Sequence, residues 1–494
     1  MRFPTPSRLL RSAAIFCIAI FFTASFCAAQ GYDQPYRPQY HFSPKEKWMN
    51  DPNGLVYFRG AYHLFFQYYP GDIVWGPMHW GHATSTDLVH WKQQPIALYP
   101  DSLGYIFSGS VVVDSANSSG FGRGGKIPLV AIFTHHDPKG EKKGSNTFQN
   151  QSLAFSLDEG ATWTKYAGNP VLKNPGITDF RDPSVSWHPK EKKWVMSLAT
   201  KDRITFYTST DLKGWAKESE FGATLGGHGG VWECPNLFPL QEGDRTHWVL
   251  LVSNNPGGPN GGSGTQYFIG DWDGHRFIPA DTATRWIDYG PDDYAGITFN
   301  NMGSQRIFLG WMSNWDYANK VPTKTWRNAM TIPRELSLQQ ADGKLYLASH
   351  PSRQQAWLVA EKNSDHRVND QVGLYRMEVG KIPLHSFAIT FANGKGQELI
   401  VGYDKATNQY YIDRSHSGKI NFHPGFGAKF FAPRIGKGKT ISLTILIDAS
   451  SVELFADDGL TVMTAVFFAD APLGRINSNA DGEEKITDLR SALR

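Results

Sequence analysis

Cysteine is scarce in this chain of 494 residues, which contains only 3. Cys17 and Cys27 lie in an N-terminal segment interpreted below as an export signal, which leaves Cys234 as the one thiol of the mature chain. A single cysteine excludes an intrachain disulfide framework, so stability must come from core packing. His79 and His82 have the spacing of half a metal site, but no second Cys or His pair accompanies them. The sequence therefore predicts no metal site.

An excess of charge of one sign is also missing, because 49 Lys and Arg face 46 Asp and Glu. Three of the basic residues, Arg2, Arg8 and Arg11, belong to the N-terminal segment, and without them the two signs balance. A neutral chain lacks the basic surface on which binding to phosphate backbones depends. Nucleic acid is therefore not expected as a partner.

Long apolar runs are confined to the N-terminus, where residues 12–22 follow three arginines and precede a stretch of small residues ending at Ala29. This order predicts a signal peptide over residues 1–29 that is cleaved, with export to the periplasm or the medium. An uncleaved anchor is the alternative, since no charge occurs before Asp33. Thr23 and Ser25 interrupt the run, which is short for a membrane span, so no membrane association is expected for the mature chain.

Glycine (49), proline (29) and the aromatic residues Trp (16), Tyr (20) and Phe (31) are abundant, as in all-β proteins with many turns. A short element recurs in which a serine and an acid precede an aromatic residue. Successive copies are spaced at roughly sixty residues, the period of a propeller blade. The copies are Ser85–Trp91, Ser156–Trp163, Ser209–Trp215 and, more weakly, Asp271–Phe277.

Five such units fit residues 32–345, and four short strands per unit predict a five-bladed β-propeller. A second element recurs with the same period, at a different position (phase) in each unit. In it, an acid lies at the start of a strand, and that strand leads through a turn to another apolar strand. Asp51, Asp182 and Glu233 occupy this phase. Because the first strand of each blade lines the central channel, the three carboxyl groups should meet at one mouth of that channel.

The repeat ends before the C-terminal part of the chain. Residues 346–366 are polar and are assigned to a linker. Residues 367–494 contain strand-like runs separated by Gly and Asp turns, such as 385–391, 441–447 and 461–467, and these predict a β-sandwich. The expected fold is therefore all-β, with a five-bladed propeller followed by a C-terminal sandwich.

Two carboxyl groups on either side of a scissile bond are the minimum apparatus for glycoside hydrolysis, provided that one is ionised and the other protonated. Asn50 and Asn53 can donate hydrogen bonds that favour the anion of Asp51, as a nucleophile needs. Asp182 follows Arg181, whose charge should keep it ionised and able to accept hydrogen bonds from sugar hydroxyls.

Glu233 has Trp232 and Cys234 as its neighbours, and an apolar setting raises a carboxyl pKa toward the range of a general acid. Taken singly, Asp51 and Asp182 also fit turn residues beside proline, and Glu233 fits a solvated surface acid. Their shared phase in the repeat favours a common site over these alternatives.

At these residues the sequence resembles glycoside hydrolase family 32, the β-fructofuranosidases, and most of all bacterial levanases and exo-inulinases. The resemblance extends over nearly the whole mature chain, and four motifs in the same order make it specific. These motifs are Trp48-Met-Asn-Asp-Pro-Asn-Gly54, Phe107-Ser-Gly-Ser110, Phe180-Arg-Asp-Pro183 and Trp232-Glu-Cys-Pro235.

The resemblance implies Asp51 as nucleophile, Glu233 as acid/base and Asp182 as stabiliser of the transition state. It also implies a set of residues that bind the terminal fructosyl unit: Trp48, Asn50, Gln67, Trp75, Phe107, Ser108, Arg181 and Trp315. The implied enzyme releases terminal β-fructofuranosyl units from levan, inulin and sucrose through a covalent intermediate, without a metal or organic cofactor.

Several alternatives remain open at the level of the sequence. A fructosyltransferase would use the same residues and pass the sugar to another sugar instead of water. A non-catalytic fructan-binding protein would be expected to lack the nucleophile or the acid, and both are present. A propeller glycosidase for arabinan or xylan is disfavoured by the Trp48–Gly54 stretch. The sequence leaves open whether the chain is a monomer or a homodimer.

Overall fold

The computed structural model describes residues 1–2, 34–353, 358–359 and 373–493. Contacts divide the chain into Met1–Gln34 and one compact unit, Pro35–Arg494, and only the second is considered below. The predicted signal peptide, 1–29, lies outside the described residues apart from its first two positions. In the described ranges the only α-helix is α1 (Pro138–Lys142), and no helix there is long and apolar enough to cross a membrane.

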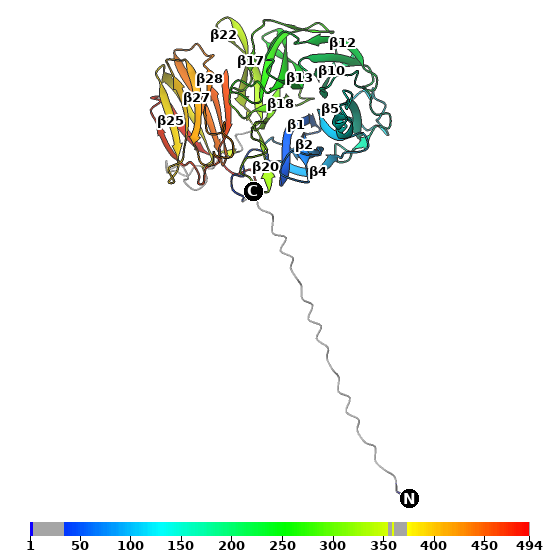
Figure 1. Ribbon diagram of the computed structural model, residues 1–494, viewed down its shortest axis with the longest axis horizontal. Coiled ribbons are helices and arrows are strands. Elements are labelled where there is room, and N and C mark those ends of the chain that lie inside the picture. Colours follow the sequence, from blue (N-terminus) through cyan, green and yellow to red (C-terminus); the bar gives the residue numbers. More distant parts are fainter. Residues whose placement is uncertain (3–33, 354–357, 360–372, 494) are drawn as a thin grey trace. The chain divides into compact units, whose positions relative to one another are not determined.

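The described strands confirm an all-β fold with a propeller followed by a sandwich, coloured from blue to yellow-green and from yellow to red in Figure 1. Five sheets form the blades. Blade one contains β1 (Lys47–Phe58), β2 (Ala61–Tyr69), β3 (His79–Ser85), β4 (Lys92–Leu98) and β20 (Trp326–Arg327). Blade two contains β5 (Tyr105–Val113), β6 (Leu129–His136), β7 (Gln149–Ser156) and β8 (Thr164–Lys165). Blade three contains β9 (Phe180–His188), β10 (Lys193–Thr200), β11 (Ile204–Ser209) and β12 (Ala216–Phe221). Blade four contains β13 (Val231–Glu242), β14 (Arg245–Asn255), β15 (Gly264–Trp272), β16 (Phe277–Pro279) and β17 (Arg285–Trp286); blade five contains β18 (Tyr294–Thr298), β19 (Ile307–Met312), β21 (Ala329–Met330), β22 (Arg334–Ala341) and β23 (Lys344–Pro351).

The first strands of the blades close a ring. Strand β1 contacts β5, β5 contacts β9, β9 contacts β13, β13 contacts β18, and β18 returns to β1. The acids predicted to share a phase lie on three of these strands, Asp51 on β1, Asp182 on β9 and Glu233 on β13. The repeat therefore identified the strands that line the channel.

The other phase of the repeat is the turn between the third and fourth strands of a blade. In blade one, Ser85 Oγ donates to Asp87 Oδ1 at 2.9 Å and the Trp91 indole donates to Leu88 O at 3.2 Å. Matching serine–aspartate and tryptophan–carbonyl bonds recur in blades two and three. The Ser-x-Asp pattern is therefore a structural turn that fixes the outer strand, and it carries no chemistry.

The boundary after the propeller differs from the sequence-based expectation. Strand β23 runs to Pro351 and pairs with β22 along its whole length, from Ala341↔Lys344 to Arg334↔Pro351. Residues 346–351, which the sequence analysis gave to the linker, therefore belong to the last strand of blade five. This strand lies at the edge of its sheet, where polar side chains are common, so its composition resembled that of a linker.

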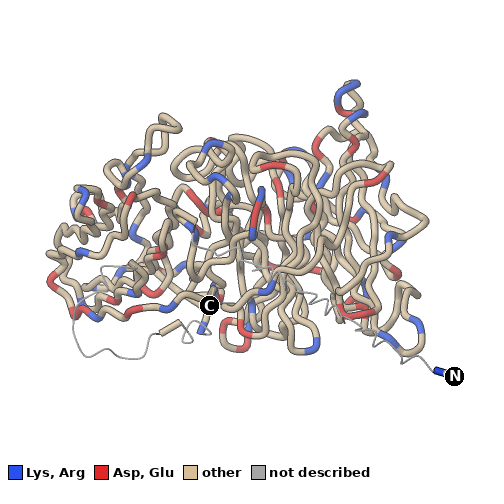
Figure 2. Tube along the Cα trace, turned by 90° about the horizontal axis from the view of Figure 1, so that it is seen from below, with Lys and Arg blue, Asp and Glu red and all other residues tan. Residues whose placement is uncertain are grey.

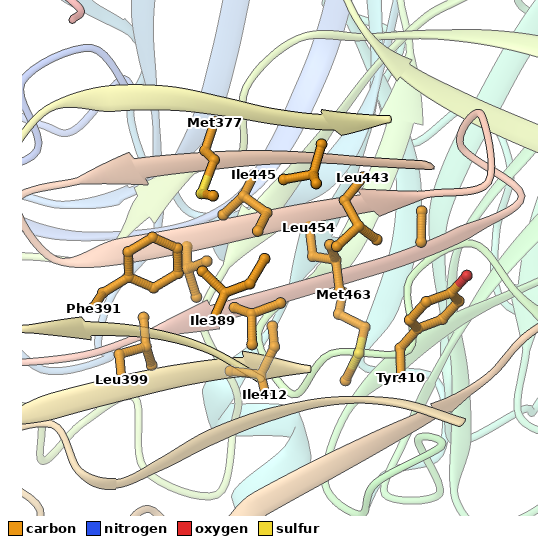
Figure 3. Packing of buried hydrophobic residues seen from close by; sticks show 14 of the residues in the cluster. Met377, Ile389, Phe391, Leu399, Tyr410, Ile412, Leu443, Ile445, Leu454 and Met463 are labelled. Atoms are coloured by element: carbon orange, nitrogen blue, oxygen red, sulfur yellow. The ribbon is translucent and has the colours of Figure 1, made fainter. Parts of the chain in front are cut away.

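The sandwich packs two five-stranded sheets around an apolar core, drawn in Figure 3. Met377, Leu443, Ile445, Leu454 and Met463 point inward from one sheet, and meet side chains such as Ile389 and Phe391 of the other. One sheet contains β24 (Tyr375–Pro383), β29 (Thr440–Asp448), β30 (Ser451–Ala456), β31 (Thr461–Val466) and β33 (Glu483–Asp488), and the other contains β25 (Phe387–Ala392), β26 (Glu398–Asp404), β27 (Gln409–His416), β28 (Lys429–Pro433) and β32 (Arg475–Ser478). Figure 2 shows basic and acidic positions interspersed along the trace.

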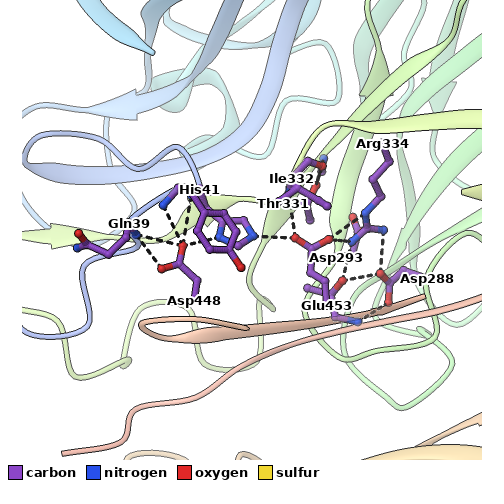
Figure 4. Close-up of polar contacts among 12 residues, drawn as sticks. Gln39, His41, Asp288, Asp293, Thr331, Ile332, Arg334, Asp448 and Glu453 are labelled. Atoms are coloured by element: carbon purple, nitrogen blue, oxygen red, sulfur yellow. Dashed lines mark hydrogen bonds and ion pairs between the residues drawn. The ribbon is translucent and has the colours of Figure 1, made fainter. Parts of the chain in front are cut away.

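A buried cluster of charged side chains joins the propeller to the sandwich (Figure 4). Arg334 of blade five is fully buried, and its Nη1 donates to Asp288 and Asp293 at 2.9 Å each. Its Nε donates at 3.0 Å to Oε2 of Glu453, a residue of sandwich strand β30. Since a buried charge is costly unless it is paired, this guanidinium fixes how the two parts meet.

His41 extends the same cluster toward the N-terminal segment. Its Nδ1 lies 2.7 Å from Asp448 Oδ2 and its Nε2 lies 2.7 Å from Glu453 Oε1. Burial would lower the pKa of His41, but hydrogen bonds and charges from Asp448 and Glu453 outweigh it and raise the pKa to about 9. His41 is therefore a buried cation at neutral pH.

Candidate active site

Each of the five inner strands carries a register irregularity near its beginning. The shifts lie between Met49 and Pro52 in β1, Ile106 and Gly109 in β5, Arg181 and Ser184 in β9, Glu233 and Asn236 in β13, and Tyr294 and Ile297 in β18. A β-bulge leaves residues unpaired and re-aims their side chains. Asp182 and Cys234 accordingly take positive φ angles of 63° and 46°. The bulges turn side chains from several blades toward one mouth of the channel.

A cavity of about 280 Å³, called the front cavity below, opens at this mouth. It brings together Asp51, Asp182 and Glu233, the three acids predicted from the repeat. The other lining residues are Asn50, Gln67, Trp75, Phe107, Ser108, His136, Glu141, Phe148, Gln149, Asp179, Arg181, Asn255 and Trp315. Carboxyl groups that lie 131 and 51 residues apart in the chain thus share one small space.

Asp51 is held at both carboxylate oxygens. Asn50 Nδ2 donates to Oδ1 at 2.8 Å, and Ser108 Oγ donates to Oδ2 at 2.7 Å. Asn53, the other expected donor, bonds instead to the backbone oxygen of Asp51 at 3.0 Å. Burial and the charge of Glu233 outweigh the two donors, so the pKa of Asp51 is raised, whereas the sequence analysis expected its anion to be favoured.

Asp182 lies deeper, and its surroundings correct a second expectation. Its Oδ2 accepts from the backbone N–H of Cys234 at 3.1 Å. Burial raises the pKa of Asp182 to about 7; Arg181 opposes this effect, and the charges of Glu233 and Asp51 add to it. Arg181 does not hold Asp182 permanently ionised, because its guanidinium donates to Glu233 and Asp179 instead. Consecutive residues of a strand point in different directions, so the expectation that Arg181 pairs with its neighbour Asp182 was wrong.

The thiol of Cys234 lies between the two aspartates. Its Sγ is 3.5 Å from Asp51 Oδ2 and 3.7 Å from Asp182 Oδ2, and donates to both. Burial and the three neighbouring carboxylates raise the pKa of this thiol well above its usual value. Cys234 is therefore a neutral donor that separates two acidic groups, and not a thiolate nucleophile.

Glu233 has polar partners rather than the expected apolar ones. Arg181 Nε and Nη2 lie 3.0 Å and 2.9 Å from its Oε1, and the Tyr294 hydroxyl donates to its Oε2. Trp232 is fully buried on the other side of the strand, in the core between blades three and four. The carboxyl of Glu233 is thus positioned by one cation and one phenol.

Replacing Tyr294 by Phe is expected to lower kcat about tenfold with a small change in KM. Burial, followed by the charge of Glu233, raises the pKa of Tyr294 well above its usual value, so the phenol keeps its proton and donates. Without that donor the Glu233 carboxyl loses one of two hydrogen-bond anchors, and the acid/base role that the resemblance implies for Glu233 depends on the position of its carboxyl. Steady-state rates on sucrose measure the effect, with Tyr317→Phe as a buried tyrosine control outside the cavity. An equal loss in both variants would assign a purely structural role to Tyr294.

The predicted binding residues fall into two groups. Gln67, Trp75 and Trp315 line the front cavity, and Gln67 is buried with its Nε2 unpartnered by protein atoms. Trp48 is fully buried and is not among the residues that line the front cavity. Its indole donates to Asn50 Oδ1 at 2.8 Å and stacks on Trp315 with ring centroids 5.9 Å apart, which supports both residues from behind.

Phe107 and Arg181 also lie where the sequence placed them, but their partners were missed. Phe107 stacks on His136 with centroids 4.2 Å apart, and Arg181 Nη1 donates to Asp179 at 2.5 Å. Further wall residues that the sequence did not suggest are Glu141, Phe148, Gln149 and Asn255. Asp179 could have been found, because it lies two residues before an arginine on an inner strand. Glu141 gave no signal, because it belongs to helix α1, an insertion outside the repeat.

The channel is closed behind the front cavity. Asn300 follows β18 of blade five, and its Nδ2 donates to Val111 O of blade two at 2.9 Å and to Val185 O of blade three at 3.2 Å. Its backbone oxygen accepts from Tyr57 N of blade one at 3.0 Å. One residue that bonds to three other blades must cross the channel axis, so the front cavity is a pocket and not a tunnel.

Comparison with known proteins follows the same division of the chain. Residues 41–349 match the N-terminal domain of glycosyl hydrolases family 32, and residues 354–491 match the C-terminal domain of that family. A levanase of Bacillus subtilis (strain 168) is 44% identical over 94% of this chain and 71% of its own length. An extracellular exo-inulinase of Aspergillus niger is 41% identical over 97% of this chain and 98% of its own.

Solved structures agree with the sequence matches. The crystal structure of exo-inulinase from Aspergillus awamori is 38% identical, with a TM-score of 0.86 over 94% of this chain and all of that one. A β-fructofuranosidase from Schwanniomyces occidentalis, complexed with fructosyl-erythritol, is 33% identical, with a TM-score of 0.82 over 93% of this chain and 99% of that one. With both domains matched in order and the carboxyl groups gathered in one pocket, the chain belongs to glycosyl hydrolase family 32.

Proposed function

We propose that this chain is a secreted, retaining glycoside hydrolase that releases terminal, non-reducing β-D-fructofuranosyl units from fructans and sucrose. The observation that carries the proposal is the front cavity, where Asp51, Asp182 and Glu233 meet on bulges of three inner strands. The names of the relatives, levanase and exo-inulinase, supply the substrate class. The fructosyl-erythritol complex of the Schwanniomyces enzyme supports a fructosyl unit as the bound group.

Glu233 and Asp51 take complementary roles in the proposed reaction. Glu233 protonates the leaving oxygen while Asp51 attacks the anomeric C2, so that the glycosidic bond breaks and a fructosyl ester of Asp51 forms. Water, deprotonated by Glu233, then attacks C2, releases fructose and restores both carboxyl groups. Two inversions at C2 give net retention.

The remaining polar groups orient the sugar and its developing charge. Ser108 and Asn50 fix the two oxygens of Asp51, so the nucleophile is held before substrate arrives. Asp182 accepts hydrogen bonds from fructosyl hydroxyls, and the unpartnered amide of Gln67 donates to another. These bonds strengthen as the ring becomes oxocarbenium-like, because charge then develops beside the carboxylates.

The closed end of the front cavity supports attack at chain ends. Because Asn300 blocks the channel, a polymer cannot thread through, and only a terminal unit fits the space. Secretion is supported by the N-terminal segment and by extracellular relatives. The same double displacement serves transfer to a sugar, and product stoichiometry separates the two outcomes.

A time course of products from levan, inulin and sucrose tests the proposal. Free fructose is expected as the sole early product of both polymers, and glucose and fructose in equal amounts are expected from sucrose. Fructose that appears more slowly than glucose would indicate transfer. Early oligosaccharides would contradict the terminal mode of attack, and no turnover of any of the three substrates would contradict the function.

A further inference from the structure

A second and larger cavity, called the rear cavity below, opens at the opposite end of the propeller channel. Its volume is about 740 Å³, against about 280 Å³ for the front cavity. It is lined by the later residues of the same inner strands, including Val113 of β5, Trp187 of β9 and Phe238 of β13. Asn300 lies between the two cavities, so a ligand in one does not reach the other.

Aromatic rings dominate one wall of the rear cavity. Trp187 is 42% exposed, the largest exposure of any tryptophan in the described residues, and its ring packs edge-on against Trp194 with centroids 5.1 Å apart. His188 stacks on Trp248 at 4.8 Å, and Trp272 lies beside both. An exposed indole braced from behind is a rigid platform for the apolar face of a ligand ring.

Few charged side chains line the rear cavity, and Arg306 among them already forms hydrogen bonds within the protein. Among the residues that the structure describes, its ionic side chains are Lys190, Glu191 and Arg306. His188 also lines it, and burial lowers the pKa of His188 to about 4. The guanidinium of Arg306 donates to the carbonyls of Gly303 and Gln305 at 2.7 Å each, and burial lowers its pKa. Such a site offers no cluster of free cations for a phosphate or carboxylate ligand.

Hydrogen-bonding capacity remains in the same walls. The lining includes Gln241 and Asn301, whose amide nitrogens donate to Thr246 Oγ1 at 2.7 Å and to Tyr57 O at 2.9 Å and each carry a second N–H. Aromatic faces together with uncharged donors and acceptors suit a ligand that presents both apolar ring faces and hydroxyl groups, which is the chemistry of a neutral oligosaccharide.

We propose that the rear cavity is a non-catalytic binding site for a neutral oligosaccharide, with Trp187 as its stacking platform. The volume is more than twice that of the front cavity and accommodates several linked sugar units. That the bound chain is fructan rests on the proposed function. A polymer held at the rear cavity keeps its free ends near the front cavity, which raises their effective concentration there.

Calorimetric titration of the Asp51→Asn variant with a purified β-2,1-linked fructan pentasaccharide tests this site. Two sites per chain are expected, one in the front cavity and one in the rear cavity. The variant allows the titration because it binds the oligosaccharide without turnover. In Asp51→Asn/Trp187→Ala the second site should weaken at least tenfold, and Trp187→Phe, which keeps a ring, should retain most of the affinity. Ile278→Ala is the control, since Ile278 is 41% exposed and lies outside the rear cavity. One site in Asp51→Asn, unchanged by Trp187→Ala, would overturn the proposal.

Turnover distinguishes this proposal from the proposed function. In Trp187→Ala alone, KM for inulin should rise about fivefold while KM for sucrose stays unchanged, because sucrose is too short to be tethered. Arabinan and xylan pentasaccharides are titrated in parallel. If either pentasaccharide bound at a Trp187-dependent site and no fructan were hydrolysed, the proposal of a rear binding site would stand and the proposed β-fructosidase activity would be rejected. Equal KM values of wild type and Trp187→Ala for inulin would reject the tethering role.

Discussion

Replacement of Asp51 by Asn is expected to lower kcat for sucrose and inulin by at least about 10⁴-fold, the scale seen when a nucleophile is removed. The amide is isosteric with the carboxylate, and its oxygen can accept from Asn50 while its new NH2 group donates to the Ser108 hydroxyl, so binding of the sugar should change little. What disappears is the oxygen anion that bonds to C2 in the proposed reaction. The measurement is the initial rate of fructose release, with circular dichroism to confirm an intact fold.

Ser108→Ala is the matched control for this prediction. It removes one hydrogen bond to the nucleophile and leaves the carboxylate in place. A loss of about 10- to 150-fold is expected, since a single hydrogen bond to a charged group contributes roughly 1.5–3 kcal/mol. If Asp51→Asn retained as much activity as Ser108→Ala, Asp51 would be a positioning residue and the nucleophile would have to be sought elsewhere in the cavity.

The period of the sequence repeat was enough to predict the blades, and the shared position of Asp51, Asp182 and Glu233 within the repeat was enough to place them in one group. Both signals are physical consequences of repetition, since blades one to three share the same turn between their third and fourth strands and every blade has an inner strand. The Ser85–Trp91 type of turn proved to be a hydrogen-bonded unit that recurs with the same contacts. The fold class was therefore readable without any side-chain geometry.

Side-chain direction at the site was not readable in the same way. The bulges give Asp182 and Cys234 positive φ angles, and no local pattern marks these residues as left-handed. Arg181 was therefore assigned to the carboxyl beside it, although it serves Glu233 from the next blade. Trp232 was likewise taken as a neighbour of Glu233 in space, although it points into the core. Adjacency in the chain gave the wrong partners for Arg181 and Trp232, although it correctly predicted that Asn50 donates to Asp51.

The buried cluster between propeller and sandwich was also invisible in the sequence, because its members are far apart. Arg334, Glu453 and His41 come from three separate segments, and each is at most 3% exposed. None of them lines the front cavity. Their effect is therefore expected on stability and not on the chemical step, which makes them a test of how the two parts are held together.

Glu453→Gln is expected to destabilise the protein by about 3–5 kcal/mol, the scale for removing one partner of a buried ion pair. Glu453 accepts from Arg334 and contacts His41, so the substitution leaves two buried cations with one anion fewer. Glu483→Gln is the matched control, because its pair with Lys381 is largely exposed and should contribute no more than about 1 kcal/mol. Urea unfolding followed by circular dichroism measures both, and equal midpoints for the two variants would show that the buried cluster is not stabilising.

The pH dependence of stability follows from His41 in the same cluster. Its pKa is raised from 6.5 to about 9 in the folded state, so its contribution is fully present below pH 6.5 and is lost as pH rises through about 9. The shift corresponds to about 3 kcal/mol. Wild-type stability should therefore fall between pH 7 and pH 10, and Glu453→Gln should flatten that fall because the proton on His41 then has only Asp448 to hold it. A variant that kept the wild-type slope would place the titrating group outside this cluster.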